Sequence, residues 1–270
     1  IKMKRHYKLS AMLICLSMAA GSFSGMNAFA YEETGTAENS AEVSEDSLDH
    51  GEPGVVDTAA DLAELLPTGY IRPQGREISP DEIRPGTSIH DGTYMSHPAS
   101  SSKYAKYSND YYYDQMSADY QEKYNILFES CVEIMEDYWT DDVEYTDFVE
   151  IGTREEADNF AFVFMIANPQ FYFCTGSYWT IYYYSDDYSS VTYGIALGVD
   201  DNFQEGMDRK AATKAVFDKA DSVIALMNKQ ENEYYREKYA HDWIVENAEY
   251  DYDGMYDNML DQSCYSTFVT

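Results

Sequence analysis

The stretch 171–199 restricts the possible folds of this chain more than any other. It is dense in aromatic and β-branched residues, and Thr175-Gly176 and Asp186-Asp187 interrupt it. Apolar runs separated by short polar breaks are typical of consecutive antiparallel strands. Helical patterns flank this stretch on both sides, so we expect an α+β fold.

The pattern before these strands predicts two helices. Apolar residues recur at steps of three and four positions, which lines one face of a helix; they are Tyr120, Tyr124, Leu127, Cys131, Ile134, Met135 and Tyr138. A short candidate strand follows at 143–151. Thr153 and Glu156 then form a capping-box pattern ahead of the apolar run 157–167, which Asn168-Pro169 ends. We expect this second helix to be buried.

Helical sequence resumes at 204–250, as one long helix or two consecutive ones. The expected buried faces are Ala215, Ala220, Val223, Ile224 and Met227 in the first part, and Tyr235, Tyr239, Trp243 and Ile244 in the second. We therefore predict an N-terminal domain of helices and antiparallel strands at 109–228. Residues 229–270 would begin a second unit.

The first 108 residues have a different composition. A basic segment, an apolar run and Ala28-Phe29-Ala30 predict a secretory signal peptide at 1–30. The apolar run is shorter than the roughly 20 residues of a membrane span, so we expect no stable span after cleavage. Residues 31–108 are acidic and rich in Ser, Gly and Pro, which predicts a disordered spacer with one short helix near 58–66. The expected location is secreted or on the cell surface.

The charge of the chain argues against nucleic acid as a partner. The formal net charge is −31, and loss of the four basic residues in 1–30 would lower it to −35. Such a charge repels phosphate backbones. A solvated acidic surface accounts for it without any particular partner.

Three cysteines remain after residue 30, namely Cys131, Cys174 and Cys264. An odd number leaves at least one thiol without a partner inside the chain, and the spacing matches neither a zinc site nor a dense disulfide framework. Whether Cys131 and Cys174 form a disulfide stays open from the sequence. Cys131 lies on the predicted helical stripe, which favours a core position.

His241, Asp261 and Cys264 could form a catalytic triad, because cysteine hydrolases pair a thiol with a histidine and a carboxylate. In such enzymes the thiol commonly lies at a helix N-terminus. Cys264 instead follows a polar segment and precedes a β-prone one, so we expect a loop there. Packing or local hydrogen bonding is the preferred interpretation of His241 and Asp242.

The segment Glu249–Leu260 resembles a calcium loop only in part. Glu249, Asp251, Asp253 and Gly254 stand at the first, third, fifth and sixth positions of an EF-hand pattern. The twelfth position is Leu260, where a bidentate glutamate is needed. An acidic turn after a helix is therefore expected, with no metal and no organic cofactor.

A family resemblance appears near the end of the sequence. "HDWIVENAEYD" at 241–251 and "DQSCYSTFV" at 261–269 resemble the opening of the transglutaminase-like core, which belongs to the papain-fold superfamily and occurs in many secreted bacterial proteins. The resemblance covers about 30 of the 270 positions directly. The region 109–228 also resembles the domain that often precedes this core.

The resemblance assigns no catalytic residue to this chain. Cys264 falls where the family generally carries alanine, and Ser266 falls where it often has glycine. The family's nucleophile follows a later Gly-containing turn, and its histidine and aspartate come later still. We expect this chain to be the N-terminal part of a longer protein, with apolar surface around Trp243 and Ile244 left partly uncovered.

The resemblance implies cysteine-dependent acyl transfer or hydrolysis of amides, with a protein or peptide as the substrate of the complete enzyme. The partner could be associated with the cell wall. The alternative is a non-catalytic cell-surface binding module, in which the aromatic strands at 171–198 bind glycan or protein through residues such as Trp179 and Tyr183. Both hypotheses stay open from the sequence.

Overall fold

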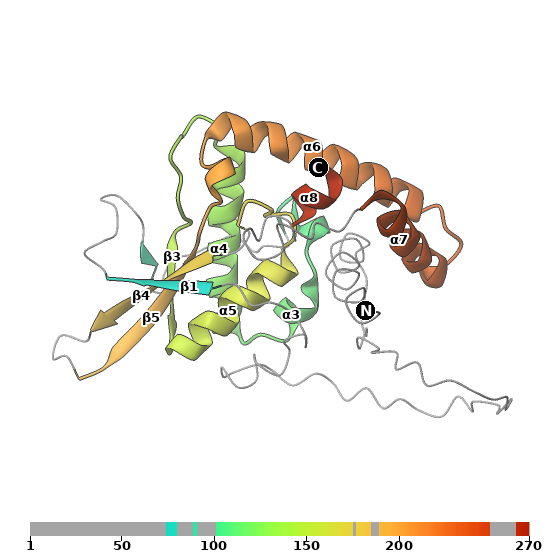
Figure 1. Ribbon diagram of the computed structural model, residues 1–270. Coiled ribbons are helices and arrows are strands. Elements are labelled where there is room, and N and C mark those ends of the chain that lie inside the picture. Colours follow the sequence, from blue (N-terminus) through green and yellow to red (C-terminus); the bar gives the residue numbers. More distant parts are fainter. Residues whose placement is uncertain are drawn as a thin grey trace, which may run out of the picture.

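The computed structural model describes residues 74–79, 89–90, 101–174, 177–184, 189–248 and 263–269. The described residues contain both helices and strands, and they do not follow a regular strand–helix–strand repeat. This confirms the α+β class (Figure 1). The elements in chain order are β1 (Gln74–Ile78), β2 (Ile89–His90), the 3-10 helix η4 (Ala105–Tyr107), α3 (Asp110–Asp114), α4 (Ala118–Glu136), β3 (Phe148–Gly152), α5 (Arg154–Ala167), β4 (Ser177–Tyr184), β5 (Val191–Leu197), the 3-10 helix η5 (Asp201–Phe203), α6 (Gly206–Met227), α7 (Glu233–Asn247) and α8 (Cys264–Phe268).

The strands form one mixed sheet in the order β1-β4-β5-β3-β2. Its centre is antiparallel: β4 pairs with β5 from Tyr178–Leu197 to Tyr184–Val191, and β5 pairs with β3. The outer pairs, β1 with β4 and β2 with β3, are parallel. The predicted antiparallel strand pair is confirmed, and it is the middle of a larger sheet.

The strands approach closely at Gly194 on β5. A Cβ atom there would lie 2.8 Å from the carbonyl oxygen of Val149 on β3, a distance that real Cβ atoms essentially never show. Glycine at this position therefore allows β5 and β3 to pair. A register shift follows in β3 between Glu150 and Gly152, where Gly152 has a φ of 146°.

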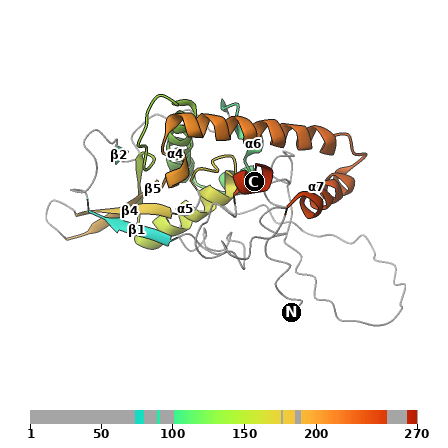
Figure 2. The same cartoon turned by 45° about the horizontal axis from the view of Figure 1, so that its top comes forward.

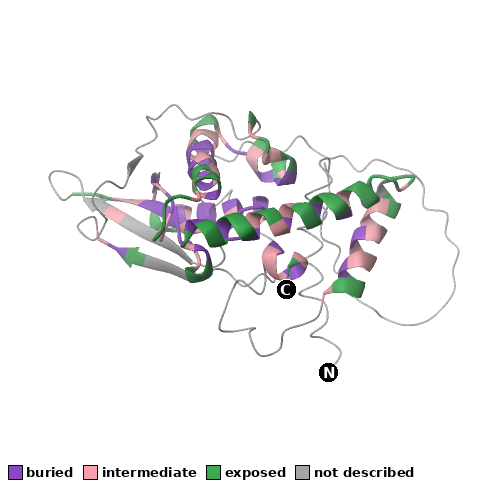
Figure 3. Ribbon diagram, turned by 90° about the horizontal axis from the view of Figure 1, so that it is seen from above, coloured by how far each residue is buried: buried purple, intermediate pink, exposed green. Residues whose placement is uncertain are grey.

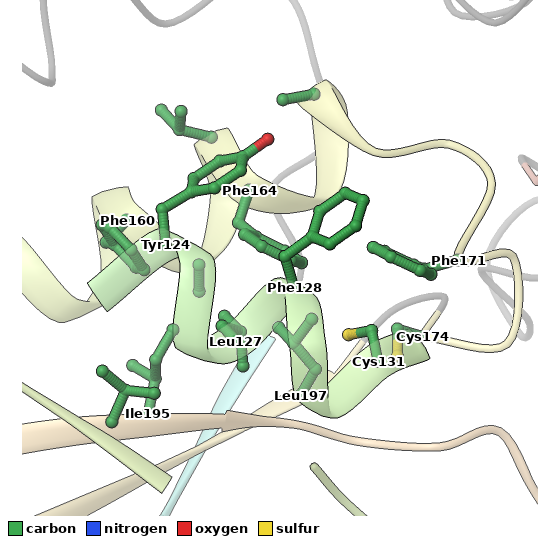
Figure 4. Close-up of a cluster of buried hydrophobic side chains, with 14 of the residues drawn as sticks. Tyr124, Leu127, Phe128, Cys131, Phe160, Phe164, Phe171, Cys174, Ile195 and Leu197 are labelled. Atoms are coloured by element: carbon green, nitrogen blue, oxygen red, sulfur yellow. The ribbon is translucent and has the colours of Figure 1, made fainter. Parts of the chain in front are cut away.

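One face of the sheet carries the main core. Side chains alternate along β3 and β5, so Val149 and Ile195 face this core while Phe148 and Ala196 lie in a separate cluster with Ile78 of β1. Helices α4 and α5 supply most of the remaining side chains, and Figure 4 shows their aromatic rings interleaved above the strands. The labelled residues there are Tyr124, Leu127, Phe128, Cys131, Phe160, Phe164, Phe171, Cys174, Ile195 and Leu197.

The two predicted helices before the strand pair are confirmed as α4 and α5. Most of the predicted stripe of α4 is buried, from Tyr120 to Met135. Thr153 caps α5: its side chain accepts from the backbone N–H of Glu156, and the Glu156 carboxylate accepts from the backbone N–H of Thr153 at 2.7 Å. This reciprocal pair satisfies two donors that the first turn of a helix leaves free.

The long helix α6 contributes to two separate cores. Its first half places Ala212 and Val216 in the main core, whereas Val223 and Met227 near its end pack with Ala240 and other residues of α7. Figure 2 shows α6 running from the region of the sheet and helix α4 to α7. Figure 3 shows exposed residues along α6. The helical region 204–250 is thus two helices joined by a short turn.

The predicted disordered spacer at 31–108 is wrong for part of its length. Gln74–Ile78 forms β1 at the edge of the sheet, Ile89–His90 forms β2 at the other edge, and 101–108 contains η4. These strands gain their hydrogen bonds from β4 and β3, far along the chain, so local composition does not reveal them. The signal peptide at 1–30 and the short helix near 58–66 lie outside the described residues.

The expectations for the end of the chain are borne out only in part. Trp243 is partly exposed, as expected, whereas Ile244 is 2 % exposed because it packs with Val223 and Met227 of α6. Tyr235, which was expected on the buried face of the helix, is 46 % exposed. Cys264 does not lie in a loop but begins the short helix α8, whose N-cap is Ser263. The Ser263 side chain accepts from the backbone N–H of Ser266 and so favours a helical turn over a strand.

Arg209 in the first turns of α6 is fully buried. Its guanidinium donates to five backbone carbonyls, those of Ile134 (3.2 Å), Asp137 (2.8 Å), Thr140 (2.8 Å), Phe203 (3.0 Å) and Gln204. These carbonyls belong to the end of α4, the segment that follows it and η5. A single side chain therefore ties three segments to α6.

We expect Arg209→Met to lower the free energy of unfolding by more than about 3 kcal/mol, because each buried carbonyl that loses its donor costs about 1–3 kcal/mol. Urea unfolding followed by far-UV circular dichroism measures the loss. The matched control is Lys214→Met on the exposed side of the same helix, where the ion pair with Asp218 contributes at most about 1 kcal/mol. Equal stability of the two variants would contradict the assigned role of Arg209.

Candidate functional site

The expected family resemblance rests on segments 241–251 and 261–269, whose described residues lie mainly in α7 and α8; the two helices touch through one pair of rings. The Trp243 ring of α7 lies 5.6 Å from the Phe268 ring of α8, centroid to centroid. Phe268 also contacts the cluster that α6 and α7 form, and the main core. Lys219 of α6 places its ammonium 5.4 Å from the centroid of the Trp243 ring. Trp243 is therefore held from two sides.

His241 lies on the half-exposed side of α7. Its Nδ1 is 3.3 Å from Oδ1 of the neighbouring Asp242, which also pairs with Lys238 one turn earlier. The hydrogen bond from Lys238, and then the one from His241, hold the pKa of Asp242 below its usual value. The histidine thus makes a local surface contact, as the packing interpretation expects.

Cys264 lies in a different environment, in the main core. It is 5 % exposed at the first position of α8. The next residue, Tyr265, stacks on Tyr172 at 5.8 Å between ring centroids and meets Phe203 edge-on at 5.0 Å. These contacts fix α8 against the core and bury the thiol beneath it.

His241 and Cys264, the two described members of the sequence-predicted triad, lie in different surroundings. The polar partner of the His241 imidazole is Asp242, and Cys264 is buried away from solvent. Asp261 and the acidic segment Glu249–Leu260 lie outside the described residues, so the expected acidic turn without a metal stays a prediction. Within the described ranges, no group of three or more His, Cys, Asp or Glu side chains could hold a metal ion.

The aromatic stretch 171–198 divides into core and strand. Phe171, Tyr172 and Phe173 form a buried turn before β4, and the Tyr172 hydroxyl donates to the carbonyl of Arg209 at 2.9 Å. Burial raises the pKa of Tyr172 well above its usual value. Tyr182 and Tyr193 pair across β4 and β5, with ring centroids 6.3 Å apart, and both are partly exposed. The side chains of Trp179 and Tyr183 lie outside the described part of the chain.

A buried polar cluster was not expected from the sequence. Ser108 donates to Asn168 Oδ1 at 2.8 Å, Asn168 donates to the Tyr124 hydroxyl at 2.6 Å, and Gln170 donates to the Ser108 hydroxyl at 2.7 Å. Gln170 Oε1 is buried without a hydrogen-bond partner. This cluster joins the segment before α3 to α4 and to the end of α5. The hydrogen bonds of the cluster link parts of the fold to one another, so we assign it a structural role.

An exposed aromatic residue was also missed. Trp139, just after α4, is 81 % exposed and lies 5.0 Å from the Tyr138 ring, centroid to centroid. The Asp137 side chain accepts from the backbone N–H of Trp139 at 3.0 Å and so fixes the turn that presents it. In the sequence, Trp139 comes directly after Tyr138, the last residue of the predicted apolar stripe, and this is the signal that could have indicated an exposed position.

Comparison with known proteins gives no neighbour: no family model, no curated protein and no solved structure matches this chain. In the ranges that the structure describes, no helix combines the length and the apolar character needed to cross a membrane.

We expect the Cys264 thiol of the reduced, folded chain to react with iodoacetamide at least about tenfold more slowly than in urea, because reaction requires local opening of the core. Mass spectrometry of the tryptic peptide that contains residue 264 measures the rate. The matched control is Ser222→Cys on the exposed side of α6, whose introduced thiol should react rapidly in both states. Faster reaction at Cys264 than at position 222 in the folded chain would indicate an activated thiolate instead.

Proposed function

We propose that this chain is the N-terminal part of an exported protein that resembles transglutaminase-like enzymes. In this proposal α7 and α8 belong to the start of the acyl-transfer core at 229–270, and the α+β region at 109–228 is the domain that precedes it. The substrate of the complete protein would be a protein or peptide amide.

The observation that carries the proposal is that α7 and α8 share one hydrophobic cluster beneath α6. The two sequence segments that resemble the family are separated along the chain, yet Trp243 of the first and Phe268 of the second are in ring contact. Both segments also pack on α6, through Ile244 and Phe268. A resemblance confined to local helix propensity would not require the two segments to share a core.

The chemistry follows from the resemblance. A cysteine thiolate attacks the carbonyl carbon of a glutamine carboxamide or peptide bond, the amine leaves with a proton from histidine, and an amine or water resolves the thioester. That cysteine is not Cys264, whose thiol is buried in the main core. The role of α7 and α8 is to form the base on which such a site is built.

The test is to sequence the source gene beyond the codon for Thr270. We expect an in-frame continuation with a Gly-x-x-Cys-x-Gly-Tyr motif and later histidine and aspartate motifs. A stop codon directly after Thr270 would overturn the proposal. As a second readout, we expect chain 1–270 and its Cys264→Ala variant to show the same absence of ammonia release from a glutamine peptide. Turnover that disappears in the variant would place the nucleophile at Cys264.

The second candidate function is a non-catalytic binding module for glycan or protein. The observation in its favour is the partly exposed pair of Tyr182 and Tyr193 on neighbouring strands, since aromatic faces of this kind stack on sugar rings.

This second function predicts that the chain retains at least one ligand on a glycan array. The double variant Tyr182→Ala/Tyr193→Ala should lose that ligand, whereas Tyr234→Ala on the exposed side of α7 should keep it. Absence of any ligand, or a ligand that both variants retain, would remove the strands from consideration as a binding surface.

A further inference from the structure

Two cysteines that are distant in sequence meet inside the main core. Cys131 lies on α4 and is 0 % exposed, and Cys174 ends the buried turn between α5 and β4 and is 4 % exposed. Figure 4 shows the two sulfur atoms side by side at the edge of the aromatic cluster. Both are free thiols in this structure.

The two thiols are close enough to influence each other. Burial, and then the neighbouring Cys174 thiol, raise the pKa of Cys131. A disulfide requires an S–S distance of about 2.0 Å, so a small movement of neighbouring side chains would form the bond. Their neighbours are apolar; Phe128 and Phe171, for example, meet edge-on at 4.9 Å.

We propose that Cys131 and Cys174 are joined by a disulfide when the chain folds under oxidising conditions. The bond would link α4 to the segment that leads into β4, and the loop it closes contains β3 and α5. Cys264 would keep its thiol. The proposal takes from the proposed function only the oxidising environment that export provides.

The reaction is a thiol–disulfide exchange, and its oxidant is a small-molecule or protein disulfide. The thiolate of one cysteine attacks the oxidant and expels one thiolate; the second cysteine then attacks the mixed disulfide and expels the other. The two cysteine thiols lose two protons and two electrons, and the oxidant becomes two thiols.

Burial determines when this reaction can occur. Both thiols are shielded from solvent in the folded chain, and burial raises the pKa of Cys131 well above its usual value, which lowers the fraction of thiolate. Exchange in the folded state should therefore be slow. The bond should form during folding, while the region around α4 and the turn after α5 is still accessible.

The experiment is oxidative refolding of the full chain in a Cys15→Ser background, which removes the thiol near the N-terminus. The reduced, urea-unfolded chain is refolded with reduced and oxidised glutathione. The remaining thiols are then alkylated in urea, where buried thiols also react, and the chain is digested with trypsin without reductant. The three cysteines fall in three separate tryptic peptides, 124–154, 155–209 and 239–270, so each pairing has its own mass.

We expect the linked pair 124–154 and 155–209 as the main product, with Cys264 alkylated. Cys264→Ala should leave this product unchanged, and Cys174→Ala should abolish it. The folded reduced chain should form it more slowly than the refolding chain. The proposal is overturned if all three thiols stay alkylatable after oxidative refolding, if Cys264 is the main partner, or if glutathione adducts predominate.

This outcome is independent of the proposed function. A gene that stops after Thr270 would remove the acyl-transfer proposal and leave the refolding result unaffected. Conversely, failure of the cross-link in glutathione buffer would remove the disulfide without bearing on the family resemblance. If Cys174→Ala fails to fold, far-UV circular dichroism will show it. Cys131→Ser, whose side chain has a similar volume to cysteine, then replaces it as the variant that should abolish the cross-link.

Discussion

The hydrogen bonds of Arg209 hold the described fold together at the point where the helices meet. The last carbonyls of α4 have no partner within the helix, and burial without partners would be costly. A guanidinium has five N–H donors in a fixed plane, and here it donates to five carbonyls from three segments. The positive charge also lies near the C-terminal end of α4, where the helix dipole favours it.

The start of α6 depends on the same junction. A Cβ atom on Gly206 would lie 2.4 Å from the carbonyl oxygen of Tyr138, so only glycine permits the close approach of α6 to the segment after α4. Asp141 accepts from the backbone N–H of Gly206 at 3.0 Å and satisfies one free donor of the first turn. From this fixed start, α6 extends to α7, and α8 packs between the main core and the second cluster. The position of α7 thus follows from contacts made at the opposite end of α6.

Local patterns in the sequence were sufficient for the elements that depend on local contacts. The stripe of α4, the capping box of α5 and the paired strands β4 and β5 each have a short-range signal, and each is confirmed. The strand β1 pairs with β4 about 100 residues later, so its stability is non-local and its Gly- and Pro-rich surroundings predict a spacer. Arg209 was missed for a related reason: a cation in a helical pattern predicts a solvated face, and the carbonyls that bury it belong to other segments.

The candidate site shows the same division between local and non-local information. The apolar pattern that includes Trp243 and Ile244 predicts a helix, and α7 confirms it. The Trp243 ring contacts Phe268 of α8. The position of Cys264 could not be predicted, because a five-residue helix has too little periodicity to be recognised and its burial depends on Tyr172 and Phe203. A thiol at a helix start can be activated only if solvent and a base can reach it. The contacts of Tyr265 with Tyr172 and Phe203 hold α8 on the core, and the same packing buries the Cys264 thiol.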